Sequence, residues 1–259
     1  MKIESKTLSE FLKKTLMTGD SMVQEGVLRF EENGLKFEAM DPANITRTSG
    51  WLKKTAFKEY EEIGNVGLNQ FHIFLKILGR FSGIVDIKKE GNILTLKANS
   101  KKLDIELVSE EFLKVKTNEP NLEFKDTFTL PAEKLKDIFK DAEVNTDAII
   151  KIETASKKVA FTVEGDYKFR NEFEAPQCSG GANSTFGQPL LNSTSLLTGM
   201  LEISVGENYP IKVVASDDTS VICIIAAPRV ENETPDEDEL ESEVKESKTE
   251  DNTPKEKEE

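Results

Sequence analysis

The chain has 259 residues, of which 37% are hydrophobic, and its formal net charge is -14 at pH 7. This length allows one large domain or two of roughly 115 to 125 residues, and the apolar content suffices for a packed core. From Glu231 onward there are 14 acidic residues and 4 lysines, so the preceding 230 residues carry a net charge of only about -4. Net charge therefore neither supports nor excludes a polyanionic partner, because the encounter depends on where the cations gather.

Residues 231–259 contain almost no apolar side chains. Such a segment cannot bury enough surface to offset the entropy of ordering its backbone, so we expect a disordered acidic tail. A solvated tail is the simplest interpretation; a tail that keeps the protein soluble or binds basic partners is the alternative.

No run of 18 apolar residues occurs, so no membrane-spanning helix is predicted. The N-terminus lacks the apolar core of a signal peptide. Cys178 and Cys223 are widely spaced, without a Cys-x-x-Cys motif, which favours free thiols in a reducing compartment, the cytoplasm or the nucleus.

The first predicted helix, near residues 8–16, places Leu8, Phe11, Leu12 and Leu16 on one stripe. A second is predicted over 68–80 with Asn69 as its N-cap. About 123 residues after the first, the segment 131–142 repeats the pattern with Leu135, Ile138, Phe139 and Ala142 on its stripe and Pro131 in the first turn. A fourth helix is predicted over 192–205, at the same offset from the second, capped by Asn192 or Ser193.

Strand-like runs with period-2 alternation follow the predicted helices. They cover 26–30, 35–39, 84–87, 93–98, 148–153, 158–163, 211–216 and 221–226. Asp217 and Asp218 separate the last two as a hairpin turn. Each half of the chain is thus a duplicated helix-plus-sheet unit, and antiparallel sheets with one face covered by helices predict an α+β fold.

Two short motifs carry a resemblance to a known family. Ala39-Met40-Asp41 ends a predicted strand in the first half, and Pro210-Ile211-Lys212-Val213 with Ala227-Pro228-Arg229-Val230 closes the second. Together they resemble the DNA sliding clamps of the proliferating cell nuclear antigen family, in their archaeal or viral form. The resemblance extends over residues 1 to about 231 and is sharp only at these motifs.

The resemblance implies the DNA clamp fold: two similar domains with sheets outside and helices inside, assembled as a trimeric ring. The expected division is an N-terminal domain over 1–109, a connector over 110–125, a C-terminal domain over 126–230 and the acidic tail over 231–259. Its implied function is that of a processivity factor, which encircles double-stranded DNA without reading its sequence and recruits DNA polymerase, clamp loader, ligase and nuclease.

Cations on the helices are the expected DNA-channel residues. Phosphate contacts of this kind carry no base information and weaken with salt, which suits a protein that must slide. The candidates are Lys13, Lys14, Lys76, Arg80, Lys134, Lys136 and Lys140. The predicted fourth helix has Glu202 and no cation, so that part of the channel wall is expected to be weakly basic.

Partner peptides are expected to place an apolar plug in a groove under the connector. By the resemblance its residues are Met40, Leu113, Val115, Pro210, Ile225, Ala227 and Pro228. Methionine suits such a site because its flexible, polarisable side chain adapts to varied plugs. Ile225 stands where eukaryotic relatives have an aromatic residue.

Subunits are expected to join by pairing edge strands, with 102–108 and 166–174 as the candidates. Both carry mixed charges, so both could pair in a homotrimer, and the preferred partner stays open. The alternative function is a clamp-fold scaffold, or an accessory subunit of a mixed ring with little DNA contact.

No enzyme is predicted. The sequence has no nucleotide-binding loop of the form Gly-x-x-x-x-Gly-Lys-(Ser/Thr), no Gly-x-Ser-x-Gly motif and no Cys/His set with metal spacing, so no cofactor or metal is expected. The sole histidine, His72, is expected in a helix without a proton-transfer role. An unrecognised hydrolase is a remote third alternative.

Overall fold

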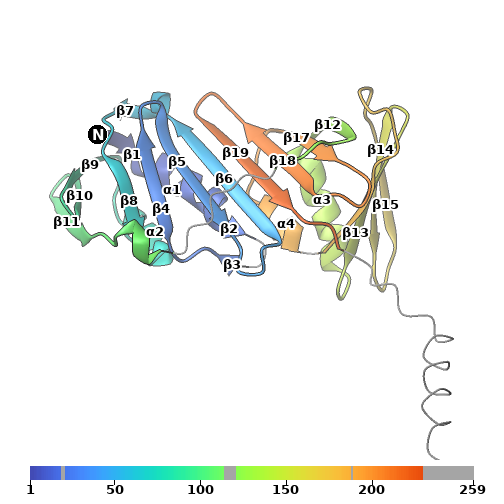
Figure 1. Ribbon diagram of the computed structural model, residues 1–259, viewed down its shortest axis with the longest axis horizontal. Coiled ribbons are helices and arrows are strands. Elements are labelled where there is room, and N and C mark those ends of the chain that lie inside the picture. Colours follow the sequence, from blue (N-terminus) through green and yellow to red (C-terminus); the bar gives the residue numbers. More distant parts are fainter. Residues whose placement is uncertain (19–20, 114–120, 188, 230–259) are drawn as a thin grey trace, which may run out of the picture. The chain divides into compact units, whose positions relative to one another are not determined.

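The computed structural model describes residues 1–18, 21–113, 121–187 and 189–229. Met1–Arg229 form one compact unit built mainly from antiparallel strands (Figure 1). The predicted acidic tail and residues 114–120 of the predicted connector lie outside the described residues, so what was predicted for them stays a prediction.

An eight-stranded sheet runs through most of this unit. Its order is β12-β17-β18-β19-β6-β5-β4-β8, and the strands are β12 (Asp126–Pro131), β17 (Met200–Val205), β18 (Ile211–Ser216), β19 (Ser220–Ala226), β6 (Thr46–Lys53), β5 (Gly34–Met40), β4 (Gly26–Glu31) and β8 (Gly64–Leu68). Strands β6 and β19 join the two halves of the chain, with Arg47 opposite Ile225 and Gly50 opposite Ile222. The two predicted domains therefore share one continuous sheet.

Two smaller sheets complete the unit, and a two-stranded ribbon accompanies them. The five-stranded sheet has the order β11-β10-β9-β1-β7, from β11 (Lys101–Glu106), β10 (Ile93–Ala98), β9 (Ile84–Glu90), β1 (Lys2–Glu4) and β7 (Phe57–Glu59). The four-stranded sheet has the order β15-β14-β13-β16, from β15 (Phe169–Glu174), β14 (Lys158–Glu164), β13 (Ile149–Ala155) and β16 (Asn183–Gly187). The ribbon pairs β2 (Met17–Thr18) with β3 (Ser21–Met22).

The described residues form four α-helices: α1 (Ser5–Leu16), α2 (Phe71–Leu78), α3 (Ala132–Glu143) and α4 (Pro189–Thr194). Two short 3-10 helices, η1 (Lys54–Ala56) and η2 (Glu110–Phe112), lie in connections. The apolar stripes predicted for the first and third helices are buried on α1 and α3. Pro131 ends β12 and caps α3 rather than entering its first turn, and Gln70 rather than Asn69 caps α2.

The prediction of a helix over 192–205 is wrong. Helix α4 ends at Thr194, and Met200–Val205 form β17, which pairs with β12 and β18. Gly199 lies between them with φ +81°, a left-handed conformation that ends a helix readily. Strand pairing on both sides of β17 thus overrides the helical spacing of its apolar residues.

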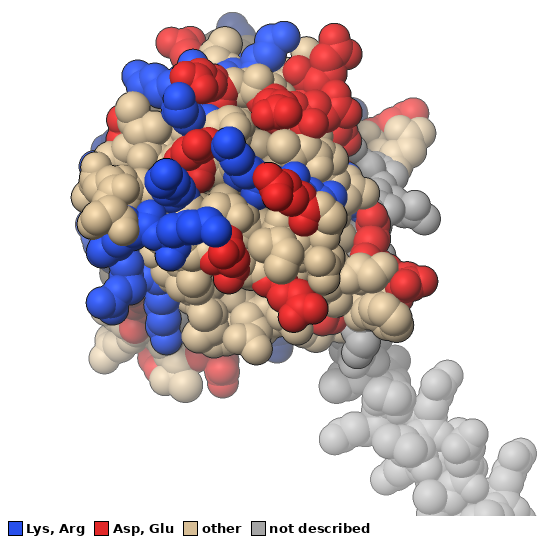
Figure 2. All heavy atoms as spheres, turned by 90° about the vertical axis from the view of Figure 1, so that its left-hand side faces the viewer, with Lys and Arg blue, Asp and Glu red and all other residues tan. Residues whose placement is uncertain are grey.

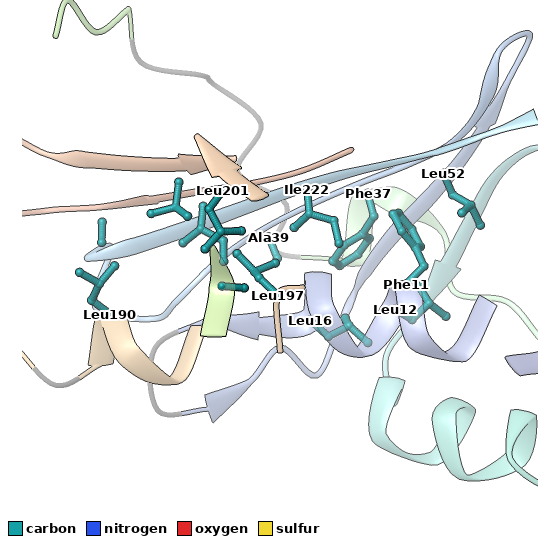
Figure 3. Packing of buried hydrophobic residues seen from close by; sticks show 14 of the residues in the cluster. Phe11, Leu12, Leu16, Phe37, Ala39, Leu52, Leu190, Leu197, Leu201 and Ile222 are labelled. Carbon is teal, nitrogen blue, oxygen red and sulfur yellow. The ribbon is translucent and has the colours of Figure 1, made fainter. Parts of the chain in front are cut away.

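Helices α1 and α4 pack against one face of the eight-stranded sheet, where they contact β6 and β19. Figure 3 shows Phe11, Leu12 and Leu16 of α1 beneath Phe37, Leu52 and Ile222 of the sheet. In Figure 1, α1 and α4 lie behind these strands. The contact is closest at Gly50 of β6, where a Cβ atom would lie 2.2 Å from Cγ2 of Thr15 and 2.9 Å from the Phe11 ring.

Replacing Gly50 with alanine is therefore expected to destabilise the fold by about 1–3 kcal/mol, since the added methyl group forces α1 away from the sheet. Urea unfolding of Gly50→Ala against the wild type measures the change. Ser49→Ala, one residue earlier and on the opposite face of β6, is the control and should cost well under half as much. Equal effects of the two substitutions would contradict the close packing of α1.

The start of the predicted connector is fixed to the edge strand β8. The Val108 N–H donates to the Gly67 carbonyl at 3.1 Å, and a Cβ atom on Gly67 would lie 2.1 Å from the Val108 carbonyl oxygen. The Glu110 carboxylate accepts hydrogen bonds from Arg29 of β4 and Asn65 of β8. These contacts position Leu113, the last described connector residue before the gap at 114–120, beside β8.

Asp126, at the start of β12, holds the loop that follows β15. Its carboxylate is 5% exposed and accepts hydrogen bonds from the Ser179 N–H at 2.7 Å, the Ser179 hydroxyl at 3.0 Å, the Gly180 N–H at 3.1 Å and the Thr154 hydroxyl. Burial opposes ionisation of Asp126, but these hydrogen bonds outweigh it and lower the pKa of the carboxyl below its ordinary value of 3.8.

The lowered pKa predicts a pH-dependent contribution to stability. Asp126 stabilises the fold above its unfolded-state pKa, and this stabilisation is lost as the pH falls through the lower folded-state pKa. At neutral pH we expect Asp126→Asn to cost about 1–3 kcal/mol, and the gap to the wild type should narrow at about pH 3. Urea unfolding at both pH values measures it; a constant gap would contradict a role for the ionised carboxylate.

Candidate nucleic-acid and partner-binding faces

The predicted DNA-channel cations lie on or next to three of the helices. On α1, Lys13 is exposed and Lys14 half-buried, while the neighbouring Leu12 is fully buried. Lys76 of α2 and Arg80 just after it are exposed. On α3, Lys134 and Lys140 are exposed and Lys136 is half-buried.

Some of these cations already have partners. Lys140 forms an ion pair with Asp137 at 2.9 Å on the same helix, which raises the lysine pKa through the hydrogen bond and the opposite charge. The pair is exposed and so contributes little to stability. Lys14 Nζ lies 3.4 Å from the Thr198 hydroxyl, so α1 adjoins the loop between α4 and β17.

Glu202 does not lie on the helical side, which corrects the expectation of an acidic residue on the channel wall. It belongs to β17 and pairs with Val214, which pairs with Cys223, which pairs with Ser49. Directly paired residues share a face, and Ser49 is on the face opposite Gly50 and α1. The six residues of α4 still include no cation.

Basic side chains gather on one side at one end of the unit. Figure 2 shows the end that carries β9, β10 and β11, where most Lys and Arg side chains lie at the left and many Asp and Glu side chains at the right. The left of this view is the far side of Figure 1, where α1 lies behind the sheet. A separation of this kind can attract a polyanion to one side although the net charge of the chain is negative.

The candidate groove residues lie on the other face of the eight-stranded sheet. Met40 pairs with Arg47, Arg47 with Ile225, and Ile225 with Lys212, so these four side chains form one row across β5, β6, β19 and β18. Arg47 and Ser49 alternate with Gly50, which places the row away from the helices. Helix cations and groove row thus occupy opposite faces of one sheet.

The remaining motif residues converge on the same edge of this row. Ala227 follows β19, and its N–H donates to the Ile45 carbonyl at 2.8 Å. Pro210 precedes Ile211, which pairs with Ala226, so Pro210 adjoins Ala227. Pro228 follows directly and is half-buried. The structure therefore brings Met40 and Ile225 together with Pro210, Ala227 and Pro228.

The groove assignments of the two connector residues, Leu113 and Val115, have different outcomes. Leu113 is 8% exposed and lies beside Gly67 of β8, two strands from Met40 in the sheet order. Val115 lies outside the described residues. The structure thus brings Leu113 to the same sheet as Met40 but not into the same row, and for Val115 the groove assignment stays a prediction.

Sequence reasoning missed two features of this face. Arg47, in the middle of the row, is only 3% exposed and forms an ion pair with Glu38 at 3.3 Å. A cavity of about 550 Å³ adjoins Met40. Its walls include Ser21, Met22, Val23, Gln24, Glu25, Gly26, Glu38, Ala39, Met40, Asp41, Pro42 and Asn44. Only the alternation within 46–53 could have placed Arg47 on this face, and its burial depends on neighbouring strands.

The two segments predicted to join subunits, 102–108 and 166–174, both contain edge strands. Strand β11 ends the five-stranded sheet and β15 ends the four-stranded sheet. Figure 1 places β11 at one end of the unit and β15 at the other. This position suits a head-to-tail contact between copies.

Among the described residues, no group of three or more His, Cys, Asp or Glu side chains could hold a metal ion. No helix in the described part of the chain is long and apolar enough to cross a membrane. His72 is exposed on α2, with Nδ1 2.7 Å from Oε1 of Gln24. Asp217 accepts hydrogen bonds from Thr219 and Ser220 in the β18–β19 turn, as predicted for a hairpin.

Comparisons with known proteins agree with this architecture. Residues 3–130 match the family model for the proliferating cell nuclear antigen, N-terminal domain. A curated DNA polymerase sliding clamp of Methanococcus maripaludis is 28% identical over 247 residues, spanning 85% of this chain and 96% of the relative.

Solved structures show the same fold. The structure of the C-terminal region of FEN-1 bound to A. fulgidus PCNA superposes with a TM-score of 0.79 at 22% identity, covering 90% of this chain and 98% of that chain. The PCNA2-PCNA3 complex from Sulfolobus tokodaii gives a TM-score of 0.72 at 18% identity, covering 89% of this chain and 99% of that chain. Given the matching family model, the curated relatives and the clamp fold, this chain belongs to the proliferating cell nuclear antigen family.

Proposed function

We propose that the chain is a subunit of a DNA polymerase sliding clamp, a processivity factor that encircles double-stranded DNA and tethers proteins to it. The main observation in support of this proposal is that two candidate binding surfaces lie on opposite sides of the eight-stranded sheet. The exposed helix cations lie on one side, and the row from Met40 through Ile225 lies on the other. Curated relatives that align along nearly their whole length bear the same functional name.

The helix cations are the proposed DNA contacts. Lys13, Lys76, Arg80 and Lys134 are exposed, so they can approach phosphates, with Lys14, Lys136 and Lys140 beside them. Contacts to phosphates position a duplex without reading its bases. Tethering then requires no catalytic group, and we propose that the protein acts without turnover, cofactor or metal, inside the cell where DNA is copied.

The row on the opposite face is the proposed peptide-binding groove. One structural neighbour is named as a PCNA bound to the C-terminal region of FEN-1. By analogy we propose that polymerase, nuclease, ligase and clamp loader bind this chain through short peptides with an apolar plug. The plug would contact Met40, Ile225, Pro210, Ala227 and Pro228, and the connector would close over it with Leu113 and Val115.

Native mass spectrometry and primer extension together test the proposal. We expect a trimer, and longer products from a cognate polymerase when the ring is loaded on a primed template. A monomer at micromolar concentration that leaves product length unchanged would contradict it.

A second candidate is an accessory subunit of a mixed ring. It is favoured by the absence of cations on α4 and by the neighbour whose name describes a PCNA2-PCNA3 complex. Loss of polymerase stimulation on Met40→Ala, together with no effect of Lys13→Ala/Lys14→Ala, would favour this candidate.

A further inference from the structure

His72 lies on the same side of helix α2 as the proposed DNA contact Lys76. Both side chains are exposed, and a separation of four residues makes them neighbours on the helix surface. The buried side of α2 consists of Phe71, Phe74, Leu75 and Leu78. Histidine is the side chain whose unperturbed charge changes between about pH 5 and 8, and the chain has only this one.

Gln24 fixes the position of one hydrogen on the His72 ring. The amide nitrogen of Gln24, Nε2, donates to the Met22 carbonyl at 2.9 Å, so its oxygen Oε1 is the atom that lies 2.7 Å from His72 Nδ1. Because an amide oxygen only accepts, Nδ1 must carry the hydrogen. The main-chain carbonyl of Gln24 also accepts from the Phe71 N–H at 2.9 Å, which holds Gln24 at the start of α2.

Protonation changes what the other ring nitrogen, Nε2, presents to a phosphate. In the neutral ring with hydrogen on Nδ1, Nε2 carries a lone pair, which repels a phosphate oxygen. In the imidazolium both nitrogens are donors, so Nε2 can donate a charge-assisted hydrogen bond to a phosphate. Nδ1 keeps its hydrogen bond to Gln24 in both states, so the ring keeps its orientation.

Helix α1 runs antiparallel to α2, which brings its last turn to the His72 end of α2. The Ser5 hydroxyl, at the start of α1, donates to the Leu78 carbonyl at the end of α2 at 2.7 Å. The Val23 N–H donates to the Leu16 carbonyl, at the end of α1, at 2.8 Å, and Val23 directly precedes Gln24. The cations in the last turn of α1 therefore belong to the same surface as His72.

The described charged groups of this surface are mostly positive. Glu10 forms an ion pair with Lys6 at 3.8 Å on α1. The other charged residues on α1, on α2 and beside Gln24 are Lys13, Lys14, Lys76 and the half-buried Glu25. An imidazolium adds a further positive charge here, and nearby phosphates favour that charged form.

We infer that His72 is a proton-dependent contact to duplex DNA, donating from Nε2 to a phosphate when the ring is charged. This inference rests on the proposed DNA-binding face and deepens it by assigning a regulation by pH. The protonated state binds more tightly, so the affinity gained at low pH is lost as the pH rises through the titration of His72. By linkage, bound duplex must in turn promote protonation of the ring.

Binding of a fluorescent DNA duplex to the full chain at low salt, followed by anisotropy at about pH 6 and about pH 8, tests this inference. The wild type should bind at least about threefold more tightly at the lower pH, with a salt dependence steeper by about one unit of slope. His72→Gln is neutral at both pH values and should lose this difference. His72→Lys is charged at both and should bind tightly at both.

A matched control moves the histidine to the opposite face of the sheet. His72→Gln/Lys36→His keeps one histidine in the chain, at an exposed position of β5, and should not restore the pH dependence. Nitrogen-15 spectra of the imidazole give a second readout, because a single histidine gives a single set of ring signals. We expect hydrogen on Nδ1 in the neutral ring and a titration midpoint that rises when the duplex is added.

The inference is overturned if His72→Gln retains the pH dependence of the wild type, if Lys36→His restores it, or if the neutral ring carries its hydrogen on Nε2. Duplex binding that is equally tight at both pH values would overturn the role of His72 and leave the proposed DNA-binding face intact. Absence of duplex binding at both pH values, in the wild type and in His72→Lys, would contradict that face itself.

Discussion

Reversing three exposed helix charges, with Lys13→Glu, Lys76→Glu and Lys140→Glu in one chain, is expected to remove DNA retention while leaving the fold intact. Each lost phosphate contact lowers the salt dependence of binding by about one unit of slope and weakens affinity at low salt. Because a ring multiplies each change by its number of copies, we expect retention on DNA and processive product length to fall by at least about tenfold.

Primer extension over a range of salt concentrations measures this effect. The control is Lys36→Glu, the same type of charge reversal at one exposed position of β5, on the face opposite the helices. It should leave product length unchanged. If the triple variant forms rings and supports long products, the helix cations are not the DNA contacts.

Truncating Met40 in the proposed groove is expected to weaken binding of a partner peptide by about 10- to 30-fold, which corresponds to about 1.5–2 kcal/mol. Met40 is only half-buried in the chain, and it borders both the row through Arg47 and the cavity of about 550 Å³. Met40→Ala therefore removes apolar contact with an incoming plug at little cost to the fold.

A fluorescent peptide with the sequence of a FEN-1 C-terminal region serves as the probe, titrated and followed by anisotropy. Met40→Leu conserves side-chain volume and should bind within about threefold of the wild type. Unfolding in urea confirms that both variants are equally stable. Wild-type affinity in Met40→Ala would place the peptide elsewhere on the molecule.

Much of the fold could be predicted from local patterns. The stripe of Leu8, Leu12 and Leu16 predicts α1, and Leu135 with Ile138 predicts α3, because an amphipathic helix must bury one side. Strand alternation predicts β18 and β19 with their turn at Asp217. The prediction of a helix over 192–205 was wrong because the spacing of Leu197 and Leu201 also suits a helix. In the structure Leu201 is buried in strand β17.

The candidate faces could be predicted only in part. Exposed helix cations follow from the same periodicity that buries the apolar stripe, so Lys13 and Lys76 are predictable from sequence. The prediction that Met40 and Ile225 lie together rested on the family resemblance, because no local pattern connects residues so far apart in the chain. Arg47 escaped notice because a lone arginine in a strand ordinarily faces solvent.

The sequence by itself determined the local elements, since periodicity, turn residues and composition act over a few neighbouring residues. The tertiary structure alone decided that β6 pairs with β19, and that the helix cations and the row proposed as a groove take opposite faces. These features depend on strand register between distant segments, which is fixed by burial of whole faces rather than by any local preference.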